Sequence, residues 1–176
     1  MNRTISIGCC LLLWFAVSSC AAQSIPAVNA IALDGSRVVL PNPGTQQVLI
    51  LTLGFSHSSA DGCESWNKRI AADYGSDARV AYYQIPNLEG APGFVIPMIL
   101  HGMRRNVPAA AHAHFVPVYD HEAEWKKLVN FSGADDAYVV VATADGRVVW
   151  QGHGRWTEAG YGELRRSVEG LVVGKR

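Results

Sequence analysis

The feature that most constrains this chain is an almost continuous apolar run from Gln47 to Phe55, followed by a polar loop over 56–62 and then a helical pattern. A run of this kind is typical of a central strand that is covered on both faces of its sheet. Strands buried on both faces are usually parallel, and helices connect them across the sheet. The order therefore predicts an α/β domain.

The helix after the loop is predicted to begin with Asp61 as its N-cap, with Glu64 completing a capping box, and to end at Gly75. Its apolar residues recur at helical spacing and form one face, made of Cys63, Trp66, Ile70 and Tyr74. We expect this face to pack on the central strand.

The rest of the pattern completes the domain. A hairpin is predicted over 31–40, around Asp34-Gly35. The other predicted strands are 79–85, 114–119 (an edge strand, because it contains Pro117), 138–143 and 147–151. The other predicted helices are 92–105, one capped by Asp120 and one capped by Thr157. This order is typical of a thioredoxin-like α/β sandwich, with a central mixed sheet, flanking helices and a C-terminal hairpin plus helix.

The N-terminus has the pattern of a secretory signal. Arg3 precedes an apolar stretch over 5–17, and small residues follow over 18–22. The apolar stretch is too short to cross a bilayer, which takes about 20 residues as a helix. Val17-Ser18-Ser19-Cys20 resembles a bacterial lipobox, which predicts a signal peptide over 1–19 and lipidation of Cys20. The alternative is ordinary cleavage after Ala22.

These assignments predict a tether over 20–29 and a thioredoxin-like domain over 30–176. The expected location is extracytoplasmic, as a periplasmic lipoprotein held at the membrane through Cys20, or alternatively as a soluble periplasmic or secreted protein. Acidic and basic residues are balanced at 15 each and interspersed. No basic stripe is present, which argues against a nucleic-acid partner.

Cys63 is the one cysteine that follows Cys20. A thiol between a strand and a helix start occupies the place of a Cys-x-x-Cys redox site, but dithiol exchange needs a second, resolving thiol. None is present in the predicted domain. Cys63 also cannot form a disulfide within that domain, so the fold has to be held by its core.

Several short motifs, in order, resemble the assembly factor of the mitochondrial ATP synthase that chaperones the membrane-embedded proton-channel subunit, and its exported bacterial relatives. The matching stretches lie within residues 33–166 and are Leu33-Asp34-Gly35, Leu40-Pro41, Leu53-Gly54-Phe55-Ser56, Trp66, Tyr83-Gln84-Ile85-Pro86, Gly102-Met103-Arg104, Gly146-Arg147-Val148-Val149-Trp150, Gly152, Gly154 and Leu164.

The resemblance implies a thioredoxin-like fold without dithiol chemistry and a role in helping a client protein fold or assemble. The candidate binding residues are Trp66, Met103, Arg104 and Trp150. A bacterial-type export signal replaces the Arg-rich leader of a mitochondrial protein. The mitochondrial client is therefore not carried over, and the client stays unknown.

Cys63 is open to two interpretations. Near a helix N-terminus its thiolate is favoured, and it could serve as a one-cysteine peroxide or mixed-disulfide site. Against this, Asp61 and Glu64 place negative charge beside it, and it shares the apolar face with Trp66 and Ile70. Free cysteine is among the most buried residues, so we favour a core cysteine. Exported thioredoxin-like reductases also carry a cis-proline before the penultimate strand, where this chain has no proline over 135–138.

Metal and cofactor sites are not predicted. His112 and His114 share an expected strand face and His57 precedes Cys63, but a copper site of the thioredoxin type needs two cysteines. The sequence holds no phosphate loop and no zinc-spaced cluster.

Two function classes remain: a redox-inactive binding or assembly factor, which we prefer, and a one-cysteine thiol-dependent oxidoreductase or peroxidase.

Overall fold

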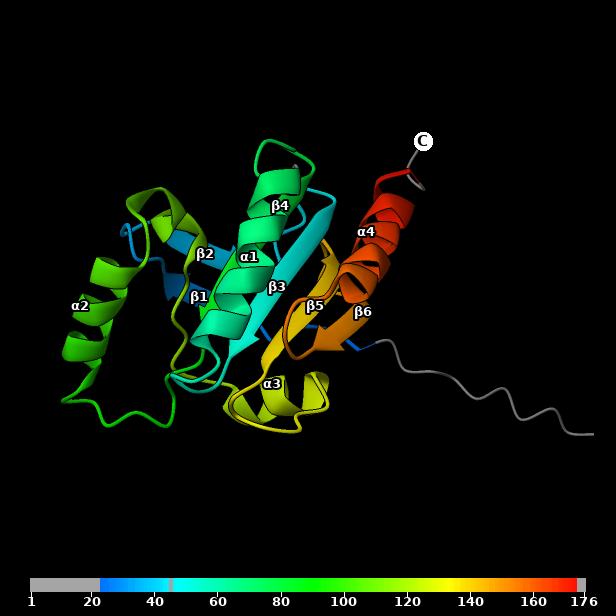
Figure 1. The fold of residues 1–176 in the computed structure, drawn as a ribbon. Coiled ribbons are helices and arrows are strands. Elements are labelled where there is room, and N and C mark those ends of the chain that lie inside the picture. Colours follow the sequence, from blue (N-terminus) through cyan, green and yellow to red (C-terminus); the bar gives the residue numbers. More distant parts are fainter. Residues whose placement is uncertain (1–22, 45, 174–176) are drawn as a thin grey trace, which may run out of the picture.

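The computed structural model describes residues 23–44 and 46–173. Its main sheet has the strand order β4-β3-β5-β6 (Figure 1) and is formed by β3 (Val48–Gly54), β4 (Val80–Pro86), β5 (Ala137–Thr143) and β6 (Val148–His153). β4 is parallel to β3, whereas β5 is antiparallel to β3 and β6 to β5. The sheet is therefore mixed, as the sequence predicted.

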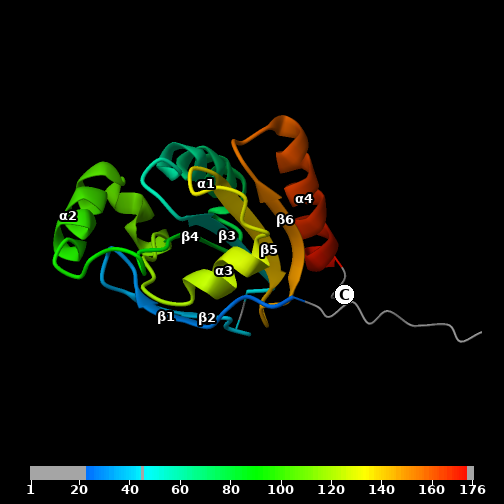
Figure 2. The ribbon, with the colours of Figure 1, turned by 90° about the horizontal axis from the view of Figure 1, so that it is seen from below.

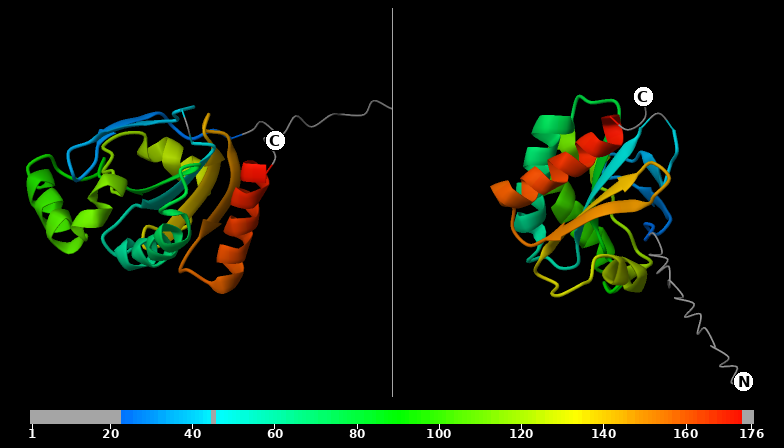
Figure 3. Two further views of the ribbon diagram at one scale, coloured as in Figure 1. Left: turned by 90° about the horizontal axis from the view of Figure 1, so that it is seen from above. Right: turned by 90° about the vertical axis from the view of Figure 1, so that its right-hand side faces the viewer.

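Each face of this sheet is covered by a different layer (Figure 2). One face carries α1 (Ala60–Tyr74) and α4 (Glu158–Val173). The other carries α3 (Glu122–Leu128) and a two-stranded hairpin of β1 (Val28–Ile31) and β2 (Arg37–Leu40). The helix α2 (Ile96–Asn106) and the 3-10 helix η1 (Ala109–His114) follow β4, and α2 lies at the end of the molecule away from α4 (Figure 3).

β3 lies at the centre of both apolar cores. All seven of its residues are buried, which confirms the strand predicted from the apolar run. Leu49, Leu51 and Leu53 face the hairpin and α3, in one cluster with Trp125. Val48 and Ile50 face α1 and α4, in a second cluster that contains Cys63, Trp66 and Leu164. The two-sided burial explains why polar residues do not alternate along this strand.

Both predicted hairpins are present. Their turns place Gly35 and Gly146 at a φ of +92°, a region that favours glycine. Thr157 caps α4 as predicted, because its Oγ1 accepts a hydrogen bond from the Gly160 N–H at 3.2 Å.

Two predicted caps are wrong. α1 begins at Ala60 with Ser59 at the N-cap position, so Asp61 lies inside the first turn and no capping box forms. The Ser59 hydroxyl instead donates to the Ser56 carbonyl at 2.8 Å. α3 is preceded by His121 rather than Asp120 as N-cap, and its first N–H, from Glu122, donates to the Glu89 carboxylate at 2.6 Å. Glu89, which is distant in sequence, thus satisfies an N–H at the start of α3 that a local N-cap side chain would otherwise bind.

Two predicted elements differ in extent. α2 begins at Ile96 rather than at residue 92, because Ala91 and Val95 make turn-type bonds to Leu88 and Pro92. Residues 114–119 do not form a full strand. Val116 and Val118 donate to carbonyls of β4, and the pairing is limited to isolated bridges. This segment does lie beside β4 at the sheet edge, where a proline without an N–H is tolerated.

The predicted tether is too long. Gln23 accepts a hydrogen bond from the Val148 N–H, Ile25 donates to the Gly146 carbonyl, and Ile25 is buried. The folded domain therefore includes residues 23–29. The predicted signal peptide and Cys20 lie outside the described residues.

Within the described ranges, no helix has the length and apolar character needed to span a membrane.

Candidate functional site

The end of β3, the loop over 55–59 and the start of α1 form the place where a redox thiol was considered. The exposed residues of this loop are His57 and Ser58, and neither is a thiol. Cys63 lies one turn into α1, on the side that faces β3, and is 1% exposed. Its Sγ donates to the Leu53 carbonyl at 3.4 Å.

Enclosure of the Cys63 thiol has an electrostatic consequence. Burial raises the pKa of this thiol to about 12, and a hydrogen bond with Ser59 only partly opposes the rise. A thiol in this state is protonated at neutral pH and is a poor nucleophile. The position of Cys63 thus favours the interpretation of a core cysteine over that of a one-cysteine enzyme.

Gly54 makes the close packing around this thiol possible. A Cβ at Gly54 would lie 2.6 Å from the Ser59 Oγ and 3.2 Å from the Cys63 Sγ. The first distance is shorter than any ordinary contact, so a side chain here would push the start of α1 away from β3.

Trp66 and Trp150 lie close together, but Trp66 is not available to a client. Its side chain is 2% exposed, and its Nε1–H donates to the Gly154 carbonyl at 3.0 Å. The helical apolar face that carries Trp66 is part of the core, so its burial argues against direct contact with a client. Trp150 is half-buried, its ring lies 6.3 Å from that of Trp66, and its Nε1–H donates to Glu163.

Met103 and Arg104 lie on α2, apart from the two tryptophans (Figure 1). Met103 is half-buried, whereas Arg104 is exposed and its Nε–H donates to the Leu33 carbonyl at 3.2 Å. The structure therefore does not gather the four candidate binding residues into one site. It places Trp66 and Trp150 together at α1 and β6, and the half-buried Met103 and exposed Arg104 on α2.

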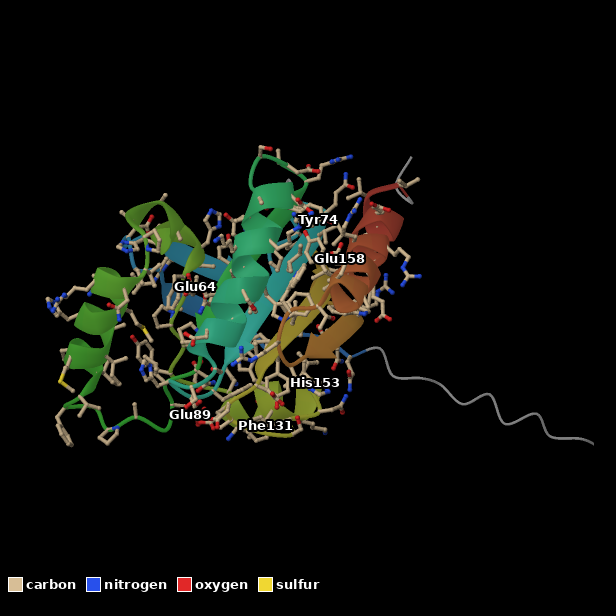
Figure 4. The ribbon with its side chains drawn as sticks, viewed as in Figure 1. Glu64, Tyr74, Glu89, Phe131, His153 and Glu158 are labelled. Carbon is tan, nitrogen blue, oxygen red and sulfur yellow. The ribbon has the colours of Figure 1, made fainter. Side chains whose placement is uncertain are left out.

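A polar edge that the sequence did not reveal lies next to the end of β3. The Ser56 Oγ–H donates to Asp135 at 3.1 Å, and His153 lies 3.7 Å from Asp136. Figure 4 shows His153 and Phe131 at this end of the molecule, beside α3. Sequence analysis found no partner for His153, because residues 136 and 153 come together only through the register of β5 and β6. Both side chains of this pair are largely exposed, so it is a weak surface ion pair.

Of the three histidines considered as metal ligands, His57 is exposed in the loop before α1, whereas His112 and His114 take part in the fold. His112 Nε2 lies 3.0 Å from the Val107 carbonyl, and His114 Nδ1 lies 3.0 Å from the Tyr82 carbonyl. The His114 ring also stacks on Tyr82 at 4.0 Å. In the part of the chain that the structure describes, no group of three or more potential metal ligands is found.

The fold is shared with solved thioredoxin-like structures. A thiol-disulfide oxidoreductase from Bacteroides fragilis is 13% identical with a TM-score of 0.53, over 82% of this chain and 98% of that chain. The exposed lipoprotein thioredoxin Etrx1 of Streptococcus pneumoniae is 13% identical with a TM-score of 0.54, over 82% of this chain and 99% of that chain. A putative thiol:disulfide interchange protein DsbE from Chlorobium tepidum is 17% identical with a TM-score of 0.55, over 85% and 96%.

These similarities confirm the thioredoxin-like fold, with its mixed four-stranded sheet, flanking helices and C-terminal helix. Identities this low show the fold alone. No family model and no curated protein matches the chain. The resemblance to the ATP synthase assembly factor gains no support from these comparisons and stays a prediction.

Proposed function

We propose that this thioredoxin-like domain is a redox-inactive binding or assembly factor for a membrane or envelope protein, exported and held at the membrane through a lipid on Cys20. The observation that carries the redox-inactive part is the position of Cys63. Its thiol is sealed between α1 and β3, hydrogen-bonded to Leu53, with its pKa raised to about 12 by burial. No second cysteine follows Cys20.

The location rests on other observations. The chain begins with a signal-like leader and a lipobox-like Val17-Ser18-Ser19-Cys20. Among the solved structures of this fold, one is described as an exposed lipoprotein and another as a DsbE. The resemblance to an assembly factor supports a client that is itself a membrane protein.

The redox part of the proposal is tested by alkylation of Cys63 in the mature protein, produced from the full chain in a bacterial host. We expect no labelling of the folded protein between pH 6 and 9, and rapid labelling once denaturant unfolds it. Ser58→Cys, at an exposed loop position, is the control that shows the reagent reaching an accessible thiol. Rapid labelling of Cys63 with a midpoint well below the free-thiol value of about 8.5 would overturn the proposal in favour of the one-cysteine enzyme.

The anchor is tested by fractionation. We expect the mature protein in the membrane fraction, with a mass that includes a lipid on Cys20. Cys20→Ala should block lipid attachment and normal processing. A soluble wild-type protein that begins after Ala22 would contradict the anchor and leave the redox test unaffected.

A further inference from the structure

A groove of about 370 Å³ runs along β1, between this strand and the segment that precedes α3. One wall is made of the six consecutive residues 28–33. The opposite wall is made of residues 118–120, and α2 contributes Leu100 and Arg104. Neither the proposed redox-inactive role nor the sequence motifs assign anything to this groove.

The β1 backbone is open on the groove side. The Ala32 N–H donates to the Ser36 carbonyl at 2.9 Å and so sets the phase of the β1–β2 ladder. Hydrogen-bonded pairs alternate along an antiparallel ladder, so Ala30 and Val28 point their backbone groups at β2. Asn29 and Ile31 therefore point theirs away from β2, and no partner for them is found among the described residues.

Two residues after β1, the chain makes one main-chain hydrogen bond to the facing segment. The Leu33 N–H donates to the Phe115 carbonyl at 3.0 Å, and the Leu33 carbonyl accepts from Arg104. Beyond this contact β1 and the facing segment separate around the groove. Pro117, two residues after Phe115, has no N–H with which to continue the ladder.

The rim of the groove combines exposed apolar side chains with unpaired positive charge. Ile31 and Tyr119, which line the groove, are 54% and 44% exposed. None of the residues of α2 is fully buried. Arg104, which lines the groove, forms no ion pair with a carboxylate within the described ranges. The one groove carboxylate, Asp120, faces His121 at 3.9 Å.

We propose that an extended segment of another protein binds here by strand addition to β1, pairing with the backbone of Asn29 and Ile31 and placing a carboxylate beside Arg104. The open edge supplies the main-chain hydrogen bonds, and the groove between Leu100 and Val118 takes one apolar side chain of the segment. This inference rests on the proposed function, since it names the surface and the chemical class of the client.

The probe is a phage-displayed library of random twelve-residue peptides, selected on the mature protein made from the full chain. Selected peptides are titrated against wild type and three variants. Ile31→Pro removes the N–H that points into the groove without touching the β1–β2 bonds, and proline is tolerated at such an edge position. Val39→Pro is the matched control, because Val39 is the equivalent exposed position on β2. Arg104→Gln removes the charge.

We expect Ile31→Pro to weaken peptide binding about tenfold or more, since it removes one main-chain hydrogen bond and blocks the edge. Val39→Pro should bind as wild type does. Arg104→Gln should weaken only peptides that carry Asp or Glu. A selected peptide synthesised with N-methylated backbone amides should not bind.

Equal binding to wild type and Ile31→Pro would overturn the inference, as would failure to select any peptide. Sedimentation of the same variants tests whether a second copy of this chain occupies the edge of β1. A wild-type dimer that Ile31→Pro dissociates would show this and would also overturn the inference. None of these results changes the outcome of the Cys63 alkylation test. The failure of this inference is therefore distinguishable from the failure of the redox-inactive function.

Discussion

The Cys63 Sγ lies 3.4 Å from the Leu53 carbonyl oxygen, so the thiol donates a hydrogen bond to the backbone at the end of β3. In a dithiol site of this fold the reactive sulfur has to be reachable from solvent at the helix start. Here it lies inside the core cluster with Trp66 and Ile70. A residue that suggests redox chemistry by its sequence position is part of the packing between α1 and the sheet.

We predict that Cys63 makes the stability of the domain fall at alkaline pH. Its folded-state pKa is raised to about 12 from 9.0, so the contribution is complete below pH 9 and is lost as the pH rises toward 12. The free energy of unfolding of wild type should fall by about 1.4 kcal/mol more per pH unit above pH 9 than that of Cys63→Ala. Urea unfolding of both proteins at pH 7, 10 and 11, with reductant present, measures the difference. Parallel pH profiles would show that the thiol is not enclosed.

Trp66 and Trp125 are both buried, yet they differ in one hydrogen bond. Trp66 Nε1–H donates to Gly154, whereas Trp125 Nε1 is buried without a partner among the described residues. Replacement by phenylalanine removes similar volume at both sites. We expect Trp66→Phe to cost about 1 kcal/mol more than Trp125→Phe, because it also leaves the Gly154 carbonyl unpaired. Denaturant midpoints of the two variants measure the difference in stability. Equal losses would contradict the hydrogen bond between Trp66 and Gly154.

Gly152 is required by the indole of Trp150. A Cβ at Gly152 would lie 2.5 Å from Trp150 Cη2. The ring would have to leave its place over β6, where it contacts Trp66. We expect Gly152→Ala to lower stability by about 1–3 kcal/mol, as overpacking typically does, and to change the near-ultraviolet circular dichroism of the tryptophans. Gly93→Ala is the control, since a Cβ there meets no atom within 4 Å. A neutral Gly152→Ala would show that the ring is free to move.

Glu89 acts as the cap of α3 from a distant loop. Its carboxylate accepts the Glu122 N–H, and Figure 4 shows Glu89 near α3. Glu89→Ala should destabilise the domain by about 1 kcal/mol, the usual loss for a helix cap. Glu64→Ala should cost nothing measurable, because α1 has no side-chain cap and Glu64 is exposed. Thermal unfolding of the two variants measures both losses of stability. A larger loss for Glu64→Ala than for Glu89→Ala would support the predicted capping box of α1 instead.

The caps of α1 and α3 show where sequence reasoning fails. Asp61 and Asp120 are good N-cap residues, but the loops before both helices are set by other contacts. Ser59 is held by Ser56 at the start of α1, and Glu89 reaches α3 from 33 positions away. Local propensity is a weak guide wherever such a contact competes with it. The pair of His153 and Asp136 was missed for the same reason.

The architecture of the domain follows from local signals in the amino-acid sequence. The apolar run of β3, the helical pattern that follows it and the glycine turns at Gly35 and Gly146 are local signals. Together they predict the mixed sheet and its helices. They carry this information because each depends only on neighbouring residues and on the cost of exposing apolar surface.

The surroundings of the candidate residues, in contrast, depend on how distant segments pack together. Whether Cys63 is a reactive thiol, and whether Trp66 is a contact for a client, depends on which side of α1 faces the sheet and how closely α4 approaches it. The open edge of β1 depends on Pro117 and Phe115, which are more than 80 positions further along the chain. Exposure and unpaired backbone groups are properties of the packed molecule, since they are set by contacts between segments that are distant in sequence.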